Sequence, residues 1–78
     1  MTREAIKTLH GFIALGGAGT VMDVSHEGLD GFPIWPDSKT IRELVTAGFL
    51  KGLARTRTDS KTWSVLPAGF KFADENPL

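Results

Sequence analysis

The sequence predicts a small α+β domain in which helices pack on a C-terminal two- or three-stranded β-sheet. Three observations predict it. Apolar residues recur at helical spacing within residues 1–16. Helix start and stop signals bracket residues 37–48. Alternating residues on both sides of a short polar turn predict a β-hairpin over residues 50–66.

Length and composition limit the class of protein. A chain of 78 residues supports one domain, here 1–78. The absence of cysteine excludes disulfides, thiolate metal sites and thiol nucleophiles. The longest apolar stretch is well short of the ~20 residues that span a bilayer. The start Met1-Thr2-Arg3-Glu4 leads into a helical pattern and not into an apolar signal segment. We therefore expect a cytoplasmic protein with no membrane partner.

Charge is unevenly distributed although the nine basic and nine acidic residues cancel. Residues 1–39 hold three basic and five acidic side chains, and residues 40–78 hold six basic and four acidic ones. Four of those six bases lie within residues 51–61. They form either a local basic patch or a solvated hairpin whose charges discourage edge pairing. Neutral net charge counts against a purely electrostatic binder of polyanions.

The first helix is predicted over residues 1–16. Thr2 is a suitable N-cap, and Gly16 and Gly17 end the helix because glycine adopts the left-handed conformation without penalty. The helix carries one apolar stripe, made of Ala5, Ile6, Leu9, Phe12 and Ile13. We expect it to pack in the core and to carry no chemistry.

Residues 17–36 are predicted as a short helix or irregular loop. Thr20 could cap a short helix that carries Val21, Met22 and Val24 and ends near Gly28. Residues 20–24 could equally form a short strand. We favour the short or irregular helix.

The segment Phe32-Pro33-Ile34-Trp35-Pro36 cannot be helical throughout, because each proline favours an extended conformation in the residue before it. Phe32, Ile34 and Trp35 are expected to fold back as a lid on the core. Alternatively, they form an exposed apolar patch that binds a partner or a second copy of the chain.

The second helix is predicted over residues 37–48, with Asp37 as its N-cap. Gly48 suits the C′ position of a Schellman ending, which places Phe49 opposite Leu44. The apolar stripe consists of Ile41, Leu44 and Val45, and the solvent face of Lys39, Thr40, Arg42, Glu43 and Thr46.

The register of the hairpin is predicted from a turn at residues 58–61. An even-numbered loop there pairs Leu53 with Leu66, Ala54 with Val65, Arg55 with Ser64, Thr56 with Trp63 and Arg57 with Thr62. Alternation then puts the arginines and hydroxyls on one face and Trp63 on the other. Pro67 opens a terminal segment, 67–78, in which Phe70 and either Phe72 or Ala73 dock, followed by a frayed tail at 74–78.

The phrase Leu44-Val45-Thr46-Ala47-Gly48-Phe49-Leu50 resembles the end of the recognition helix in the winged helix-turn-helix superfamily. There, leucine, two variable residues and alanine-glycine-leucine lead into the wing. The phrase Trp63-Ser64-Val65-Leu66-Pro67-Ala68-Gly69-Phe70 is similar to the return strand and the leucine-threonine-x-x-glycine helix start of multidrug-resistance-type regulators. Pro67 stands in place of the usual threonine cap, and the second helix expected between Gly19 and Gly28 is short. The resemblance implies a small winged helix-turn-helix domain.

The resemblance also implies a DNA-binding site. The helix over 37–48 would enter the major groove, and the wing would meet the DNA backbone or the minor groove. Expected at base edges are Ser38, Lys39, Thr40 and Arg42; expected on the wing are Lys51, Arg55, Arg57 and Lys61. Glu43 and Asp59 would oppose phosphate binding, unless Glu43 reads a cytosine amino group. The partner would be double-stranded DNA, and the protein a transcriptional regulator or a phage-type accessory factor. A module this small would need to form a homodimer for specificity, through the first helix or residues 32–35.

The alternative is a protein-interaction module on the same fold, an adaptor, assembly factor or inhibitor of a host protein that does not bind DNA. Neutral charge and the Phe32, Ile34 and Trp35 cluster favour it.

We do not expect an enzyme, a catalytic residue, a metal or a cofactor. His10 and His26 lack metal-ligand spacing. The glycine-rich run at 16–20 follows a helix and lacks the lysine of a phosphate loop.

Overall fold

The computed structural model describes residues 1–24, 26–27, 33–34, 36–52 and 62–78. These residues form three α-helices, a short 3₁₀ helix and two small antiparallel sheets. In chain order the elements are α1 (Arg3–Ala14), β1 (Ala18–Thr20), η1 (Val21–Val24), β2 (His26–Glu27), β3 (Pro33–Ile34), α2 (Ser38–Thr46), β4 (Leu50–Gly52), β5 (Thr62–Val65) and α3 (Pro67–Glu75).

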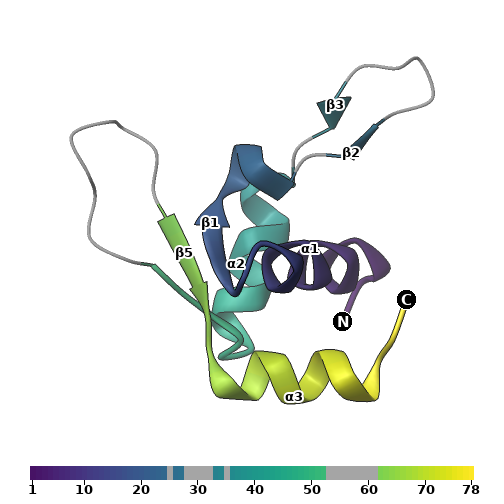
Figure 1. Ribbon diagram of the computed structural model, residues 1–78, viewed down its shortest axis with the longest axis vertical. Coiled ribbons are helices and arrows are strands. Elements are labelled where there is room, and N and C mark those ends of the chain that lie inside the picture. Colours follow the sequence, from purple (N-terminus) through teal and green to yellow (C-terminus); the bar gives the residue numbers. More distant parts are fainter. Residues whose placement is uncertain (25, 28–32, 35, 53–61) are drawn as a thin grey trace.

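The main sheet has the order β1-β5-β4 and is antiparallel throughout. Strand β5 is therefore central. It pairs with β1, from the first half of the chain, on one side and with β4 on the other. In Figure 1, α1 and α2 occupy the middle of the molecule, α3 lies at one end, and the β2–β3 pair projects from the body. The predicted α+β class, with helices on a three-stranded sheet, is confirmed.

Helix α1 follows the prediction closely. The Thr2 hydroxyl accepts a hydrogen bond from the Ala5 N–H, 3.2 Å away. At the other end Gly16 and Gly17 have positive φ, and their N–H groups donate to the carbonyls of Ile13 and Phe12 in a Schellman ending. Most of the predicted stripe faces the interior, since Ala5, Leu9 and Phe12 are fully buried and Ile13 packs against the core. Ile6 is only half-buried, whereas Thr8, which lies outside the predicted stripe, is buried.

The segment after α1 contains more strand than the sequence predicts. Strand β1 pairs with β5, which the glycine-rich composition did not suggest. The favoured short helix is present as η1, but it ends at Val24 and not near Gly28, because His26 and Glu27 belong to β2. The alternative strand over 20–24 is wrong beyond Thr20. Thr20 donates to Asp23 Oδ2 through both its N–H and its hydroxyl, each at 2.9 Å, and these bonds start η1.

The β2–β3 pair lies within the segment for which we predicted a loop. Phe32 and Trp35 fall outside the described residues, and Ile34 is described only as a backbone position in β3. Their roles as a lid, a partner surface or a dimer surface therefore stay predictions.

The predicted hairpin register is wrong. Leu50, Lys51 and Gly52 face Val65, Ser64 and Trp63, so the first strand pairs four residues earlier than expected. The physical reason is burial: Leu50 and Val65 are 2% and 6% exposed, and this register brings both into the core. A shift by an even number of residues leaves each face of β5 as predicted, with Val65 and Trp63 inward. The expected turn at 58–61 lies outside the described residues.

Helix α3 extends farther than the sequence predicts. Asp74 and Glu75 belong to its last turn and not to a frayed tail. Phe72 holds this turn by stacking on Phe49, with ring centroids 4.6 Å apart, and Ala73 is buried beside it. Phe70 is 41% exposed, with its ring tip close to Gly17. Beyond the helix, the Asn76 carbonyl accepts a hydrogen bond from His10 Nε2 at 2.8 Å.

Candidate functional site

Helix α2 is held firmly at both ends, which defines the directions of its side chains. Asp37 Oδ1 accepts a hydrogen bond from the Thr40 N–H at 2.8 Å, as predicted for the N-cap. At the C-terminus the Gly48 and Phe49 N–H groups donate to the carbonyls of Val45 and Leu44, each at 3.0 Å. This confirms the predicted Schellman ending. It also directs the chain straight into β4.

The buried face of α2 differs from the predicted stripe. Thr40 is 8% exposed and lies on the inner side with Ile41 and Leu44, whereas Val45 is 40% exposed. The expectation that Thr40 reads base edges is therefore wrong. The prediction assigned only apolar residues to the buried stripe, so it placed Val45 there and Thr40 on the solvent face. Thr40 is nevertheless compatible with burial, because its hydroxyl also bonds Asp37.

The outer face of α2 carries the remaining polar residues that the sequence assigned to the site. Ser38, Lys39 and Arg42 are all exposed, as is Thr46 one turn further on. With about 3.6 residues per turn, Lys39, Arg42 and Thr46 all point away from the buried face of α2. Within this outer face, Arg42 lies on the side nearer Val45 and Lys39 on the side nearer Glu43.

Glu43 does not stand on the outer face as expected. Its Oε1 accepts a hydrogen bond from the Thr2 N–H at 2.8 Å, and its Oε2 accepts one from the Thr2 hydroxyl at 2.9 Å. The carboxylate thus ties α2 to the start of α1. Its predicted reading of a cytosine amino group does not fit this geometry, because Thr2 engages both carboxylate oxygens. The same hydrogen bonds lower the pKa of Glu43 and keep it negatively charged, so its opposition to phosphate binding stays a prediction.

Of the residues expected on the wing, the structure describes Lys51, which is exposed on β4 opposite Ser64. Because Leu50 points into the core, alternation places Lys51 on the outer surface of the sheet. Arg55, Arg57 and Lys61 lie outside the described residues, so their place in the site stays a prediction.

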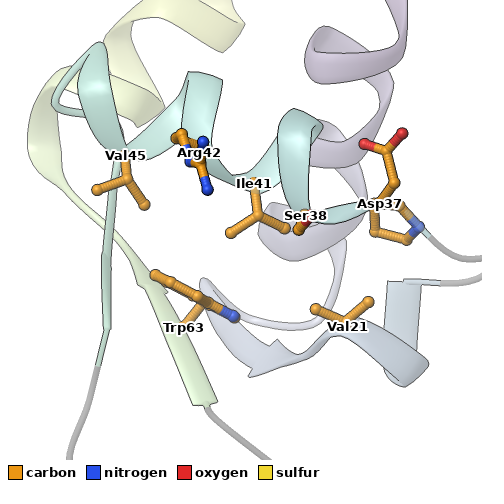
Figure 2. Close-up of a pocket in the computed structure, with 8 residues that line it drawn as sticks. Val21, Asp37, Ser38, Ile41, Arg42, Val45 and Trp63 are labelled. Atoms are coloured by element: carbon orange, nitrogen blue, oxygen red, sulfur yellow. The ribbon is translucent and has the colours of Figure 1, made fainter.

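A groove of about 460 Å³ runs along the flank of α2, and sequence reasoning missed it. Its walls come from α2, η1 and β5. These elements are separated in the sequence, so no local sequence pattern indicates that they lie together. Figure 2 shows Ile41 and Val45 projecting from α2 toward Trp63, with Val21 on the far side. The lining residues are Val21, Pro36, Asp37, Ser38, Ile41, Arg42, Val45 and Trp63.

Another hollow, of about 490 Å³, lies along α1 and includes Lys7, His10, Asp23 and Leu78. His10 is engaged there with the Asn76 carbonyl. Among the described residues, no three His, Asp or Glu side chains gather as a metal-binding group. No described helix combines the length and the apolar composition needed to cross a bilayer.

Comparison with known proteins gives no relative. No protein-family model matches this chain, and no curated protein or solved structure matches it significantly.

Three carboxylates near this site should make stability fall in acid. The Thr2 N–H and then its hydroxyl lower the pKa of Glu43, and the same pair of groups on Thr40 lowers the pKa of Asp37. The Thr20 N–H and then its hydroxyl lower the pKa of Asp23. Because the unfolded chain takes up these protons first, the stability that they contribute is present above the ordinary pKa values of about 3.9 and 4.3 and is lost as pH falls through the lower folded values.

The measurement is the urea midpoint at pH 6 and at intervals below pH 5. The triple variant Asp23→Asn, Asp37→Asn and Glu43→Gln should show a shallower loss of stability in acid than the wild type. An equal slope in both proteins would mean that these hydrogen bonds do not perturb the three carboxylates.

Proposed function

We propose that this protein is a small winged-helix DNA-binding domain that places the outer face of α2 in the major groove and the β4–β5 hairpin on the backbone. The observation that carries the proposal is the composition of that outer face. Ser38, Lys39 and Arg42 are exposed on it, while the carboxylate of the neighbouring Glu43, which stays ionised, is directed toward Thr2. Lys39 and Arg42 thus present two positive charges on this face of a protein of zero net charge.

The order of elements supports the same proposal. Helix α2 passes through the Gly48 turn directly into the hairpin that carries Lys51, so helix and hairpin are presented as one unit. Arginine at a base edge pairs with guanine O6 and N7 through two hydrogen bonds, which is the role proposed for Arg42. Lys39 and Lys51, together with the wing residues Arg55, Arg57 and Lys61, would contact phosphates. Such a protein would act as a transcriptional regulator or a phage-type accessory factor, as a homodimer where a specific site is bound.

The test is fluorescence anisotropy with random duplex DNA across a salt series. We expect log K to fall linearly with log salt, because bound lysines and arginines displace condensed counterions. Lys39→Ala should reduce the magnitude of the slope by about one if it contacts a phosphate. Lys71→Ala, an equal loss of charge on the exposed surface of α3, is the matched control and should leave the slope nearly unchanged.

Absence of binding at low salt by a folded protein would refute the proposal. Equal effects of Lys39→Ala and Lys71→Ala would show instead that net charge, and not the face of α2, governs binding.

The second candidate is the protein-interaction module, and the groove beside α2 favours it. DNA offers phosphates and polar base edges, whereas the groove offers Val21, Ile41, Val45 and Trp63. A partner bound mainly through these side chains would show little dependence on salt.

A further inference from the structure

We propose that the groove between α2 and β5 binds a short acidic peptide segment of a partner protein, with a large apolar side chain against Trp63 and a carboxylate on Arg42. This site goes beyond DNA binding and does not depend on it.

The floor and walls of the groove are apolar and come from three elements. Val45 is 40% exposed although it lies next to the buried Leu44, so its side chain is available at the lip. Ile41, on the same helix, belongs to the core, and Trp63 and Val21 across the groove pack against the core, so packed side chains support both walls. A volume of about 460 Å³ falls within the ~300–1,000 Å³ range of ligand sites. The groove therefore suits large apolar side chains on a short segment.

The charge at the rim selects an acidic segment. Among the described residues, Arg42 has no carboxylate partner, and it lies on the same stretch of α2 as Ile41 and Val45. Asp37 also borders the groove, but its carboxylate caps α2 and points away from Trp63 in Figure 2. A guanidinium beside an apolar surface binds a carboxylate through two parallel hydrogen bonds. The complementary ligand thus combines an apolar side chain with Asp or Glu.

The groove and the outer face of α2 can be tested separately. Helical periodicity places Ile41 and Val45 on the flank toward Trp63 and Lys39 on the far side of the outer face, with Arg42 shared between them. Val45→Gln would replace the apolar side chain at the lip of the groove with a neutral amide and leave the charge of α2 unchanged. It should weaken peptide binding and preserve DNA binding, so the two functions respond differently.

The experiment begins with a displayed library of random twelve-residue peptides, selected on the wild-type protein and counter-selected on Val45→Gln. Selected peptides are then synthesised with a fluorescent label and titrated against the wild type, Val45→Gln, Arg42→Gln and Lys39→Ala. We expect selected sequences that pair Leu, Phe or Trp with a nearby Asp or Glu. Val45→Gln should lower affinity about 10-fold, because the bound apolar side chain would desolvate the glutamine amide without giving it a hydrogen-bond partner. Arg42→Gln should also weaken binding, and Lys39→Ala should not.

The location of binding is read from amide and indole NMR signals, with the spectra also checking that each variant is folded. Peptide-induced shifts should include Val45, Ile41 and the Trp63 indole. The proposal is overturned if no peptide survives counter-selection, if the survivors lack acidic residues, or if their shifts map elsewhere. It is also overturned if duplex DNA, and no peptide, shifts Trp63 and Val45, because the groove would then be part of the DNA interface. Failure of the salt-series experiment would leave the peptide result unaffected.

Discussion

Replacing Leu44 with alanine is expected to lower the free energy of unfolding by about 2–5 kcal/mol, the usual cost of truncating a buried leucine. Leu44 is fully buried, within the cluster that joins α1, α2 and the sheet. A domain of this length has a total stability of only about 4–12 kcal/mol. Leu44→Ala should therefore remove a large fraction of it, measured as a lower urea midpoint with an unchanged m-value.

Val45→Ala is the matched control, since the same stripe predicted burial for both residues. Val45 is 40% exposed, so its truncation should change the stability by no more than about 0.5 kcal/mol. Similar losses for the two variants would mean that α2 packs on a different face. The outer face and the groove would then both be misassigned.

Gly69→Ala is expected to destabilise the protein by about 1–3 kcal/mol, because α3 packs too closely on Phe49 to admit a methyl group. A Cβ at this position would lie 2.7 Å from the Phe49 carbonyl oxygen and 2.9 Å from Val65 Cγ1. The same carbonyl accepts the Leu66 N–H at 2.9 Å, so it cannot move without loss of that hydrogen bond. Thermal or urea denaturation of the variant measures the effect.

Intrinsic helix propensity predicts the opposite sign for Gly69→Ala, a gain of up to about 1 kcal/mol inside a helix. Gly11→Ala is the control within α1. Its Cβ would meet the Val24 side chain at 3.3 Å, a contact that a small side-chain movement relieves. We expect a change below about 1 kcal/mol for Gly11→Ala, because the propensity gain offsets this contact. Stabilisation by Gly69→Ala would contradict the close packing of α3 on Phe49.

Local signals explain why much of the fold was predictable. Thr2, Asp37 and the glycines at 16, 17 and 48 act through hydrogen bonds within a few residues of each helix end. Their effects do not depend on the rest of the molecule, so the ends of α1 and α2 follow from the sequence. The exposure of Ser38, Lys39 and Arg42 follows in the same way from helical periodicity.

The sequence by itself determined the α+β class, the caps of the first two helices and the cationic residues on the outer face of α2. The tertiary structure decided the hairpin register, the burial of Thr40 in place of Val45, the binding of Glu43 to Thr2, and the groove beside Trp63. The physical reason is the range of the interactions. Caps and periodicity act between neighbours in the chain, whereas register and burial depend on which distant side chains fill the core together.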